Sequence, residues 1–488
     1  MVGGGTALLA PALEGAVGLS APRGGPASKD RQTSKGRPKS GPSHVEPAAE
    51  ARPGLAVRMA AAKLLSAVVD SRVSADGLTD PAGGHPAFRA LDARDQGLVK
   101  AILVTALRFR GTIGAALEGC LDRPLPAGAL SLAHLLHVGA AQILHLDVPD
   151  SAAVDLAVAA ALADPRNRRF SGLVNAVLRR VSREKAELLA AADPRRDTPA
   201  WLYERLVAAY GEEEATAIAT LHRLPAPLDL SVKSDPERWA RELGGIVLPT
   251  GSVRLAELSG PVTALPGFED GEWWVQDAAA ALPARLFRAM GGKRIADLCA
   301  APGGKTAQLA AAGAKVTALD LSASRRKRLD GNLARLRLDA ETLVQDLRTY
   351  QPETLFDGVL LDAPCSSTGT IRRHPDVAYT KGPEEIEKLA GVQAGLLDAA
   401  AALVAPGGTL VFSNCSLDPV EGEGVARSFL AAHADFALDA VAAAELPGLE
   451  AAVTQEGFVR TTPATLRLST PALSGLDGFF AARFVKNS

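Results

Sequence analysis

Four cysteines are the residues of this chain best suited to covalent chemistry, and three of them stand at or just beyond the ends of predicted strands. These three are Cys299, Cys365 and Cys415, whereas Cys120 lies among helix-forming residues. A thiolate is the most reactive nucleophile available near neutral pH, although its reference pKa of about 8.5 means that it needs local help to ionise. Buried cysteines are also common as small apolar residues. Three at one edge of a sheet nevertheless favour a nucleophilic site.

The spacing of the cysteines argues against two other common uses of this residue. The chain has no Cys-x-x-Cys pair and no histidine cluster beside a cysteine, so we expect neither a zinc site nor a disulfide framework. A reducing cytoplasm fits this cysteine usage. Three polar residues flank Cys415, and we expect them to supply polar contacts to its thiol: Ser413, Asn414 and Ser416.

The first strand-ending cysteine belongs to a turn that suits a cofactor. An apolar run at 295–298 is followed by Pro302, Gly303 and Gly304, and then by the helix formers of 306–312. Such a turn lets a ligand approach the bare backbone, and the helix behind it directs unpaired N–H groups toward that ligand. Many strand-to-helix turns contain glycine for geometry alone, but an adenosine-bearing cofactor could lie here.

Acidic residues follow the next predicted strands in the same manner. The second strand ends in Asp320, sixteen residues after Gly304, close to where a nucleotide-binding fold has its ribose-binding carboxylate. The third and fourth strands end at Asp346 and Asp362. Open α/β sheets bind ligands beyond the carboxyl ends of their strands, so these polar ends describe one crevice.

Composition and charge limit the classes of protein to which this chain can belong. A chain of 488 residues with 47% hydrophobic side chains can form several domains with real cores. The net charge of −2 argues against a uniformly basic nucleic-acid binder. No uninterrupted apolar segment reaches about 18 residues, so we predict no membrane span.

Residues 1–54 are rich in Pro, Gly and Ser, and we predict that they are disordered rather than a dedicated RNA-binding arm.

A helical region with one basic segment follows. Apolar residues recur at helix spacing throughout 55–185. Its last segment, 164–185, combines an apolar stripe with a basic face made of Arg166, Arg168, Arg169, Arg179, Arg180 and Arg183. Charge alone leaves open whether this face binds RNA or is only solvated.

A small α+β connector is expected after the helical region. A helix near 199–210 and a strand at 227–232 indicate its two kinds of element. Trp273 and Trp274 lie at its end, where aromatic side chains more often pack at a domain junction than stack on a base.

Two motifs of the helical region resemble the RNA-binding domain of the antitermination factor NusB. They are Leu146-Asp-Val-Pro149 followed by Ala153-Val154, and Gly172-Leu-Val-Asn-Ala-Val-Leu-Arg-Arg180. The resemblance covers about a quarter of the chain, and it implies that the basic face contacts RNA.

The C-terminal half resembles the RNA cytosine-5 methyltransferases that use S-adenosylmethionine. Four blocks carry this resemblance: Asp297-Leu-Cys-Ala-Ala-Pro-Gly-Gly-Lys-Thr306, Asp362-Ala-Pro-Cys-Ser-Ser-Thr-Gly369, Arg372-Arg-His-Pro-Asp376 and Ser413-Asn-Cys-Ser416. With the NusB-like part in front and Asp477-Gly-Phe-Phe-Ala-Ala-Arg483 near the end, the chain resembles the RsmB (Sun) family. That family methylates small-subunit ribosomal RNA.

The resemblance implies a role for each residue of the crevice. Cys415 falls on the family's nucleophile, Cys365 on its release-assisting cysteine, and Asp362 on the edge where cofactor and target base meet. Asp320 would hold the cofactor ribose and Asp346 would lie near its adenine. The rest of the cofactor would lie on the turn formed by Cys299, Ala300, Ala301, Pro302, Gly303, Gly304 and Lys305. The family usually has threonine before the nucleophile, where this chain has Asn414.

We therefore expect three folded parts: an all-α RNA-binding domain at 55–190, a small α+β connector at 191–271, and a C-terminal α/β Rossmann-like class I methyltransferase domain at 272–488 with seven strands. The expected protein is a monomeric cytoplasmic enzyme that uses S-adenosylmethionine to methylate C5 of a cytosine in small-subunit rRNA, without a metal. Two alternatives remain. One is an RNA-binding antitermination or ribosome-assembly factor with an inactive methyltransferase domain, and the other is the same chemistry on transfer RNA.

Overall fold

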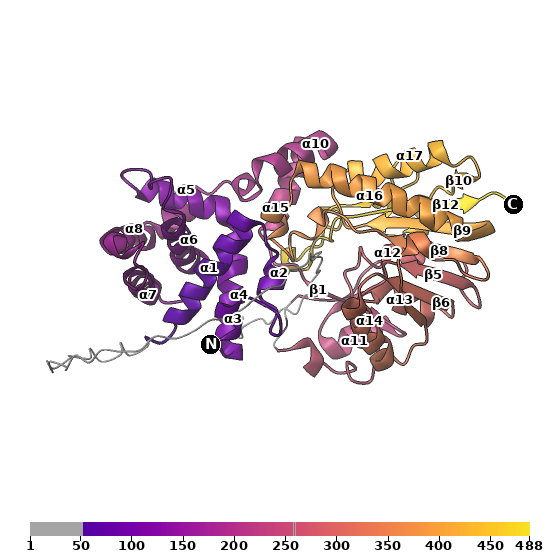
Figure 1. Cartoon of the computed structure of the whole chain (residues 1–488), viewed down its shortest axis with the longest axis horizontal. Helices are drawn as coiled ribbons and strands as arrows, with labels where there is room; N and C mark the ends of the chain where they lie inside the picture. The colour runs from indigo at the N-terminus through magenta and orange to yellow at the C-terminus, as the bar shows by residue number, and fades with distance from the viewer. Residues whose placement is uncertain (1–51, 257, 259) are drawn as a thin grey trace, which may run out of the picture.

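The computed structural model describes residues 52–256, 258 and 260–488. The disorder predicted for 1–54 concerns mainly residues 1–51, which lie outside the described residues. Figure 1 shows the helices of the N-terminal part on one side and the large sheet on the other. The helices α10 (Ala200–His222) and α15 (Val377–Thr380) lie between them.

Apolar residues at helix spacing build the N-terminal helical part. Each long helix buries one stripe in a common core. Gly139 lies so close to a neighbouring helix that a Cβ there would be 2.5 Å from Leu178, so a residue without a side chain sets this close approach. The helices are α1 (Leu55–Ser71), α2 (Ala75–Leu78), α3 (Pro86–Arg89), α4 (Ala93–Arg108), α5 (Arg110–Cys120), α6 (Leu130–His145), α7 (Asp150–Ala163), α8 (Ser171–Arg183) and α9 (Lys185–Ala190).

The basic segment at 164–185 is not one continuous helix. A loop and a 3-10 turn at Arg168–Phe170 come first, and the α-helix begins only at Ser171. In the loop, the Asp164 carboxylate accepts the backbone N–H of Arg166 at 3.0 Å, and the Asn167 amide donates to Ser131 at 2.8 Å. Such local side-chain bonds compete with helix formation. The first three arginines of the basic face therefore lie before α8 and not along it.

The connector contains α10, a four-stranded antiparallel sheet and a short helix that packs on it. Its last strand lies beyond residue 271, because Trp273–Val275 pairs with the first strand. The indole N–H of the buried Trp273 donates to the Pro266 carbonyl at 2.9 Å, and that of the buried Trp274 donates to Gln276 at 2.8 Å. Both tryptophans therefore pack, as expected. The elements are β1 (Leu228–Val232), α11 (Pro236–Leu243), β2 (Ile246–Val247), β3 (Val253–Leu255) and β4 (Trp273–Val275), in the order β2-β3-β1-β4.

The C-terminal sheet has eight strands, one more than expected. Five of them pair in parallel, in the order β9-β8-β5-β6-β7, and β12 adds to β9 in the antiparallel direction. The far edge of β12 is long enough to take two short strands, β10 near its end and β11 near its start, which accounts for the extra one. The strands are β5 (Arg294–Leu298), β6 (Lys315–Asp320), β7 (Glu341–Val344), β8 (Phe356–Asp362), β9 (Val404–Asn414), β10 (Phe436–Leu438), β11 (Val459–Thr461) and β12 (Phe479–Lys486).

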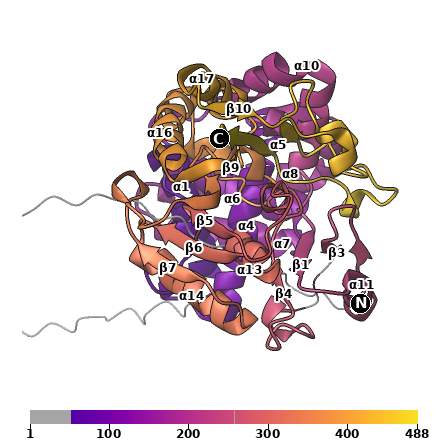
Figure 2. The ribbon, with the colours of Figure 1, turned by 90° about the vertical axis from the view of Figure 1, so that its right-hand side faces the viewer.

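Helices cover both faces of this sheet, so its central strands are apolar on both sides. Alternate residues of β8 point to opposite faces of the sheet: Val359 and Leu361 pack in one core cluster and Leu360 in another. Figure 2 shows α16 and α17 near β9 and β10, and α13 and α14 near β5 to β7. The bounds of the helices that cover the sheet are α12 (Leu282–Arg285), α13 (Gly304–Ala311), α14 (Ala323–Leu336), α16 (Pro383–Ala402) and α17 (Val425–Ala432).

The block Arg372-Arg-His-Pro-Asp376 joins the three parts of the molecule. The Arg373 guanidinium contacts Asp277 at 2.6 Å and Asp477 at 3.0 Å, and it also donates to a carbonyl of the connector at 3.0 Å. His374 faces Asp76 of the helical part at 3.3 Å, and the Asp376 carboxylate accepts the backbone N–H of Ala75 at 3.0 Å. This block therefore holds the helical part and the connector against the large sheet.

Candidate active site

The glycine turn lies between β5 and α13, as the sequence predicts. Cys299 and Gly303 have left-handed φ values of 61° and 100°, and a Cβ at Gly303 would approach the Leu329 side chain to 3.0 Å. The backbone conformation at 303 therefore favours glycine, and a side chain there would also crowd Leu329. The α13 helix begins at Gly304, so its first backbone N–H groups face the crevice.

Asp297 lies below this turn, inside the protein. Its Oδ2 accepts the Thr306 hydroxyl at 2.6 Å, whereas its Oδ1 has no hydrogen-bond partner among the described residues. Burial raises the pKa of this carboxyl to about 7, against the lowering effects of Thr306 and Lys305. A buried acceptor without a partner is costly, so this atom is suited to a donor from a bound ligand.

Asp320, at the end of β6, organises the next part of the crevice. Its carboxylate accepts the backbone N–H of Ala301 at 3.2 Å and that of Ser322 at 2.9 Å, and Arg325 contacts it at 2.6 Å. The side chain therefore joins the glycine turn to the start of α14. Asp346 lies beyond β7, the neighbouring strand, and its carboxylate pairs with Arg348.

A buried lysine and an aspartate connect the turn to β8. The Lys305 ammonium lies 2.6 Å from the Asp362 carboxylate and 4.9 Å from the centre of the Phe479 ring. The other oxygen of Asp362 accepts the Ser413 hydroxyl at 3.0 Å. The pair thus places one positive and one negative group between the turn and the cysteines.

Two thiols face each other at the carboxyl ends of β8 and β9. The sulfur atoms of Cys365 and Cys415 are 3.4 Å apart. The hydrogen bond from the Cys365 thiol lowers the pKa of Cys415 despite burial, with smaller contributions from Ser367 and Lys305, whereas the same contact and burial raise the pKa of Cys365. The arrangement therefore favours a thiolate on Cys415 and a protonated thiol on Cys365.

The remaining two cysteines are poor nucleophiles. Burial, together with nearby carboxylates, raises the pKa of Cys299 to about 12. Burial also raises the pKa of Cys120, which lies in the helical part. A raised pKa disfavours the thiolate, so Cys299 is less suited to nucleophilic attack than Cys415.

The polar residues beside Cys415 make contacts other than those expected. Ser413 donates to Asp362, and Asn414 donates to the backbone carbonyl of Glu421 and accepts the N–H of Ser416. The Ser416 hydroxyl donates to the Glu421 carboxylate at 2.6 Å. These side chains shape the loop and do not contact the thiol. Glu421 was absent from the predicted site, because nothing in the sequence distinguishes it from the neighbouring acid Glu423.

The six arginines of the basic face have different surroundings. Arg166 pairs with Asp164 at 2.8 Å, and Glu184 pairs with Arg180 at 3.0 Å and with Arg183 at 3.5 Å. The other three, Arg168, Arg169 and Arg179, are exposed and form no ion pair with any described residue. The face keeps an excess of positive charge at the surface of the helical part.

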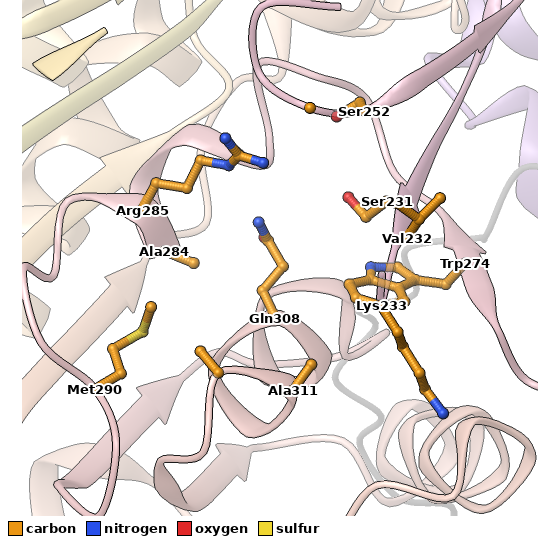
Figure 3. A pocket seen from close by; sticks show the side chains of 12 residues that line it. Ser231, Val232, Lys233, Ser252, Trp274, Ala284, Arg285, Met290, Gln308 and Ala311 are labelled. Atoms are coloured by element: carbon orange, nitrogen blue, oxygen red, sulfur yellow. The ribbon is translucent and has the colours of Figure 1, made fainter. Parts of the chain in front are cut away.

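Two cavities lie away from these residues. One, of about 280 Å³, lies between the connector sheet and the far end of α13, where Arg285, Gln308 and Trp274 line it (Figure 3). The other, of about 390 Å³, lies against α5 and α6 in the helical part. Neither is lined by a predicted catalytic or cofactor residue.

Metal-ligand clusters and membrane-spanning helices are both absent from the described part of the chain. No cluster of His, Cys, Asp or Glu side chains there could hold a metal ion. No helix there is long and apolar enough to cross a membrane.

The sheet order and the site define the class of protein. A Rossmann-like sheet with an antiparallel strand inserted beside β9, a glycine turn after β5 and polar ends on β6 and β8 is the class I methyltransferase fold. Residues 285–485 match the family model described as 16S rRNA methyltransferase RsmB/F, and residues 55–183 match the NusB family. The expected fold class is confirmed.

Known proteins identify the family. The chain is 35% identical to ribosomal RNA small subunit methyltransferase B of Cronobacter sakazakii over 82% of this chain and 93% of that protein. It is 39% identical to the protein of that name from Xylella fastidiosa, over 89% of this chain and 99% of that one. The solved structure of PH0851, at 23% identity, covers 90% of this chain and all of its own with a TM-score of 0.64, and so supports the fold. This chain belongs to the RsmB (Sun) family of ribosomal RNA methyltransferases.

Proposed function

We propose that this protein transfers a methyl group from S-adenosylmethionine to C5 of a cytosine in small-subunit ribosomal RNA, through a covalent adduct with Cys415. The observation that carries the proposal is the pair of thiols 3.4 Å apart beside the Lys305–Asp362 pair. Family membership supports the methyltransferase class, and the names of the relatives support small-subunit rRNA as the substrate.

The residues of the turn fit S-adenosylmethionine. The partnerless Oδ1 of Asp297 can accept a donor, Gly303 and Gly304 leave the backbone bare, and the buried Asp320 lies at the end of the next strand. We assign the cofactor to these residues and to the rest of the turn, with Asp346 on the adenine side. When bound, the cofactor supplies a methyl group on a positively charged sulfur.

Cys415 begins the reaction on the base. C5 of cytosine is a poor nucleophile, and addition of the Cys415 thiolate to C6 moves the electron pair of the C5–C6 bond onto C5, which can then attack a methyl group. Negative charge also develops toward N3, which needs a hydrogen-bond donor or proton source, and we assign that edge of the base to Asp362 and to the Lys305 ammonium 2.6 Å from it.

Cys365 acts in the second half of the reaction. After methylation the C5 proton passes to water, the electron pair of the C5–H bond re-forms the double bond, and the Cys415 sulfur departs with the electron pair of the C6–S bond. The Cys365 thiol lies 3.4 Å from the Cys415 sulfur and can donate its proton to that sulfur as it departs, so we assign Cys365 to this release step. The target cytosine must be unstacked or single-stranded to reach the two thiols.

The helical part would bring the RNA to this site. We propose that it binds RNA through the six arginines of its basic face, and that the chain divides into functional parts near residues 190 and 271. We also propose that the enzyme acts as a monomer in the cytoplasm.

Bisulfite sequencing of total RNA from cells with and without the gene tests the proposed substrate. We expect one or more cytosines of small-subunit rRNA to lose their methylation when the gene is deleted, and the methylation to return with the wild-type gene. Loss of methylation in transfer RNA instead would show that transfer RNA, and not small-subunit rRNA, is the substrate. Unchanged methylation of all RNA would support a binding factor with an inactive methyltransferase domain.

A further inference from the structure

Glu421 is a buried carboxylate that lies between the two cysteine loops, in the short π-helix Val420–Gly424 beyond β9. Its side chain is fully buried. Its Oε1 accepts the backbone N–H of Ser366 at 2.8 Å and the Gln393 amide at 3.0 Å. Its Oε2 accepts the hydroxyls of Ser416, at 2.6 Å, and of Ser366. Four donors from three segments therefore converge on one carboxylate.

These donors lie next to the reactive thiols. Ser366 directly follows Cys365, and Ser416 directly follows Cys415. The two loops leave different strands, β8 and β9, and backbone bonds join them as well, for example from the Gly369 N–H to the Cys415 carbonyl at 2.9 Å. The Glu421 carboxylate accepts hydrogen bonds from both loops, through the residue that follows each cysteine, and the Ser366 and Ser416 hydroxyls also lie 3.2 Å from each other.

We propose that Glu421 is a positioning residue that holds the Cys365 and Cys415 sulfurs at their working separation. This inference rests on the proposed function, in which both thiols must reach one base. In this role Glu421 contacts neither the base nor the cofactor. It acts through Ser366 and Ser416, and its carboxylate is required because all four partners donate.

The amide of glutamine cannot replace this carboxylate. A carboxylate offers two oxygens with about four acceptor positions, whereas a glutamine side chain offers one such oxygen and an NH₂ group that only donates. In Glu421→Gln, the NH₂ group would face at least one donor from a cysteine loop. Without an acceptor there, the two loops are expected to separate.

Steady-state kinetics of the full-length protein are the first part of the test. For Glu421→Gln we expect kcat for RNA methylation to fall on the order of tenfold to a hundredfold, as for the removal of hydrogen bonds to a charged group. The S-adenosylmethionine affinity should stay within about twofold, because the turn after β5 is untouched. Glu421→Asp, which keeps the charge with a shorter reach, should recover part of kcat. Glu456→Gln is the matched control, since that exposed carboxylate pairs with Arg427 at the surface.

The separation of the sulfurs can be measured without methylation. Diamide oxidises two neighbouring thiols to a disulfide and takes up their two protons and two electrons. In the wild-type protein, sulfurs 3.4 Å apart should form the Cys365–Cys415 disulfide rapidly, as peptide mass spectrometry would show. In Glu421→Gln this reaction should slow at least as much as kcat falls, whereas Glu456→Gln should oxidise at the wild-type rate.

The two readouts separate this inference from the proposed function. Wild-type kcat and wild-type disulfide rate in folded Glu421→Gln would overturn the positioning role. Slowed disulfide formation in Glu421→Gln, when the wild-type protein methylates no cytosine, would preserve the role and overturn the proposed function. If Glu421→Gln does not fold, Ser416→Ala removes a single donor to the same carboxylate. Ser416→Ala should then slow disulfide formation, and an unchanged rate would again overturn the role.

Discussion

At the scale of single residues, the crevice consists of side chains that each join two segments. Asp320 bonds to the glycine turn and to the start of α14, and Asp362 bonds to Lys305 and to Ser413. Such shared carboxylates fix the loops around the site before a ligand binds, which lowers the ordering cost of binding.

Removal of the Asp320 carboxylate tests its role in the cofactor site. We expect Asp320→Ala to weaken S-adenosylmethionine binding on the order of tenfold to a hundredfold, because hydrogen bonds to a charged acceptor typically contribute about 1.5–3 kcal/mol. Isothermal titration calorimetry measures this directly. Asp330→Ala, which removes a carboxylate further along α14, is the control and should bind like the wild type. Equal affinity in Asp320→Ala and the wild type would remove Asp320 from the site.

Residue types and strand ends were enough to predict that Cys299, Cys365 and Cys415 lie at one edge of the sheet, but not what holds them. Each follows an apolar run and parallel strands end at one edge, so this shared edge was predictable, whereas the joint role of Cys365 and Cys415 came from the resemblance. The burial of Glu421 depends on how the segment Val420–Gly424, which follows β9, packs between the two cysteine loops. No local pattern records that contact, and the Lys305–Asp362 pair was missed for the same reason.

At the scale of elements, strands were better predicted than the basic segment. The predicted second strand ends at Asp320, as β6 does, because a short apolar run between turn residues admits few other structures. The segment at 164–185 was expected to continue as one helix face. Side-chain bonds of Asp164 and Asn167 instead delay the helix until Ser171, and such competition is not visible in hydrophobic spacing.

The α8 face provides the test of RNA binding. We expect Arg179→Ala with Arg183→Ala to weaken RNA binding and to reduce the slope of log K against log salt by about one unit for each arginine–phosphate pair that is removed. The affinity for S-adenosylmethionine should not change. The matched control is Arg89→Ala with Arg94→Ala, which removes the same charge from α3 and α4. If the α8 variant has the same salt slope as the wild type, this face is only solvated and does not bind RNA.

At the scale of the whole molecule, the Arg372-Arg-His-Pro-Asp376 block connects the helical part, the connector and the methyltransferase domain. The sequence marked this block by resemblance alone. Its partners, Asp76, Asp277 and Asp477, lie far from it in the chain, so its role as a junction could not be predicted from local pattern. The connector helix α10 adds a second link, since Arg205 pairs with Asp418 just beyond Cys415.

The junction predicts a pH-dependent stability. Burial lowers the pKa of His374, but the hydrogen bond and charge of Asp76, with Asp376 and Asp477, raise it overall. A raised pKa in the folded state means that the pair stabilises fully below the unfolded pKa of about 6.5 and that this stabilisation is lost as pH rises through the folded pKa.

Thermal unfolding of Asp76→Asn tests this dependence. We expect this variant to be less stable than the wild type by on the order of 1 kcal/mol at about pH 6, and the difference to shrink toward about pH 9 as His374 loses its proton. Asp92→Asn, an exposed helix cap in the same part of the chain, should show a difference that does not change with pH in this range. A difference for Asp76→Asn that is equal at both pH values would contradict a charged His374 at the junction.

Denaturing gels of the covalent RNA adduct test thiol catalysis most directly, in the two cysteine variants. We expect Cys365→Ala still to attack and methylate the base but to release it poorly, so that an adduct accumulates. Cys415→Ala should form no adduct and no 5-methylcytosine, and adding it to Cys365→Ala should abolish the adduct. An adduct that forms in Cys415→Ala and disappears in Cys365→Ala would reverse the two roles, and full methylation by both variants would contradict thiol catalysis altogether.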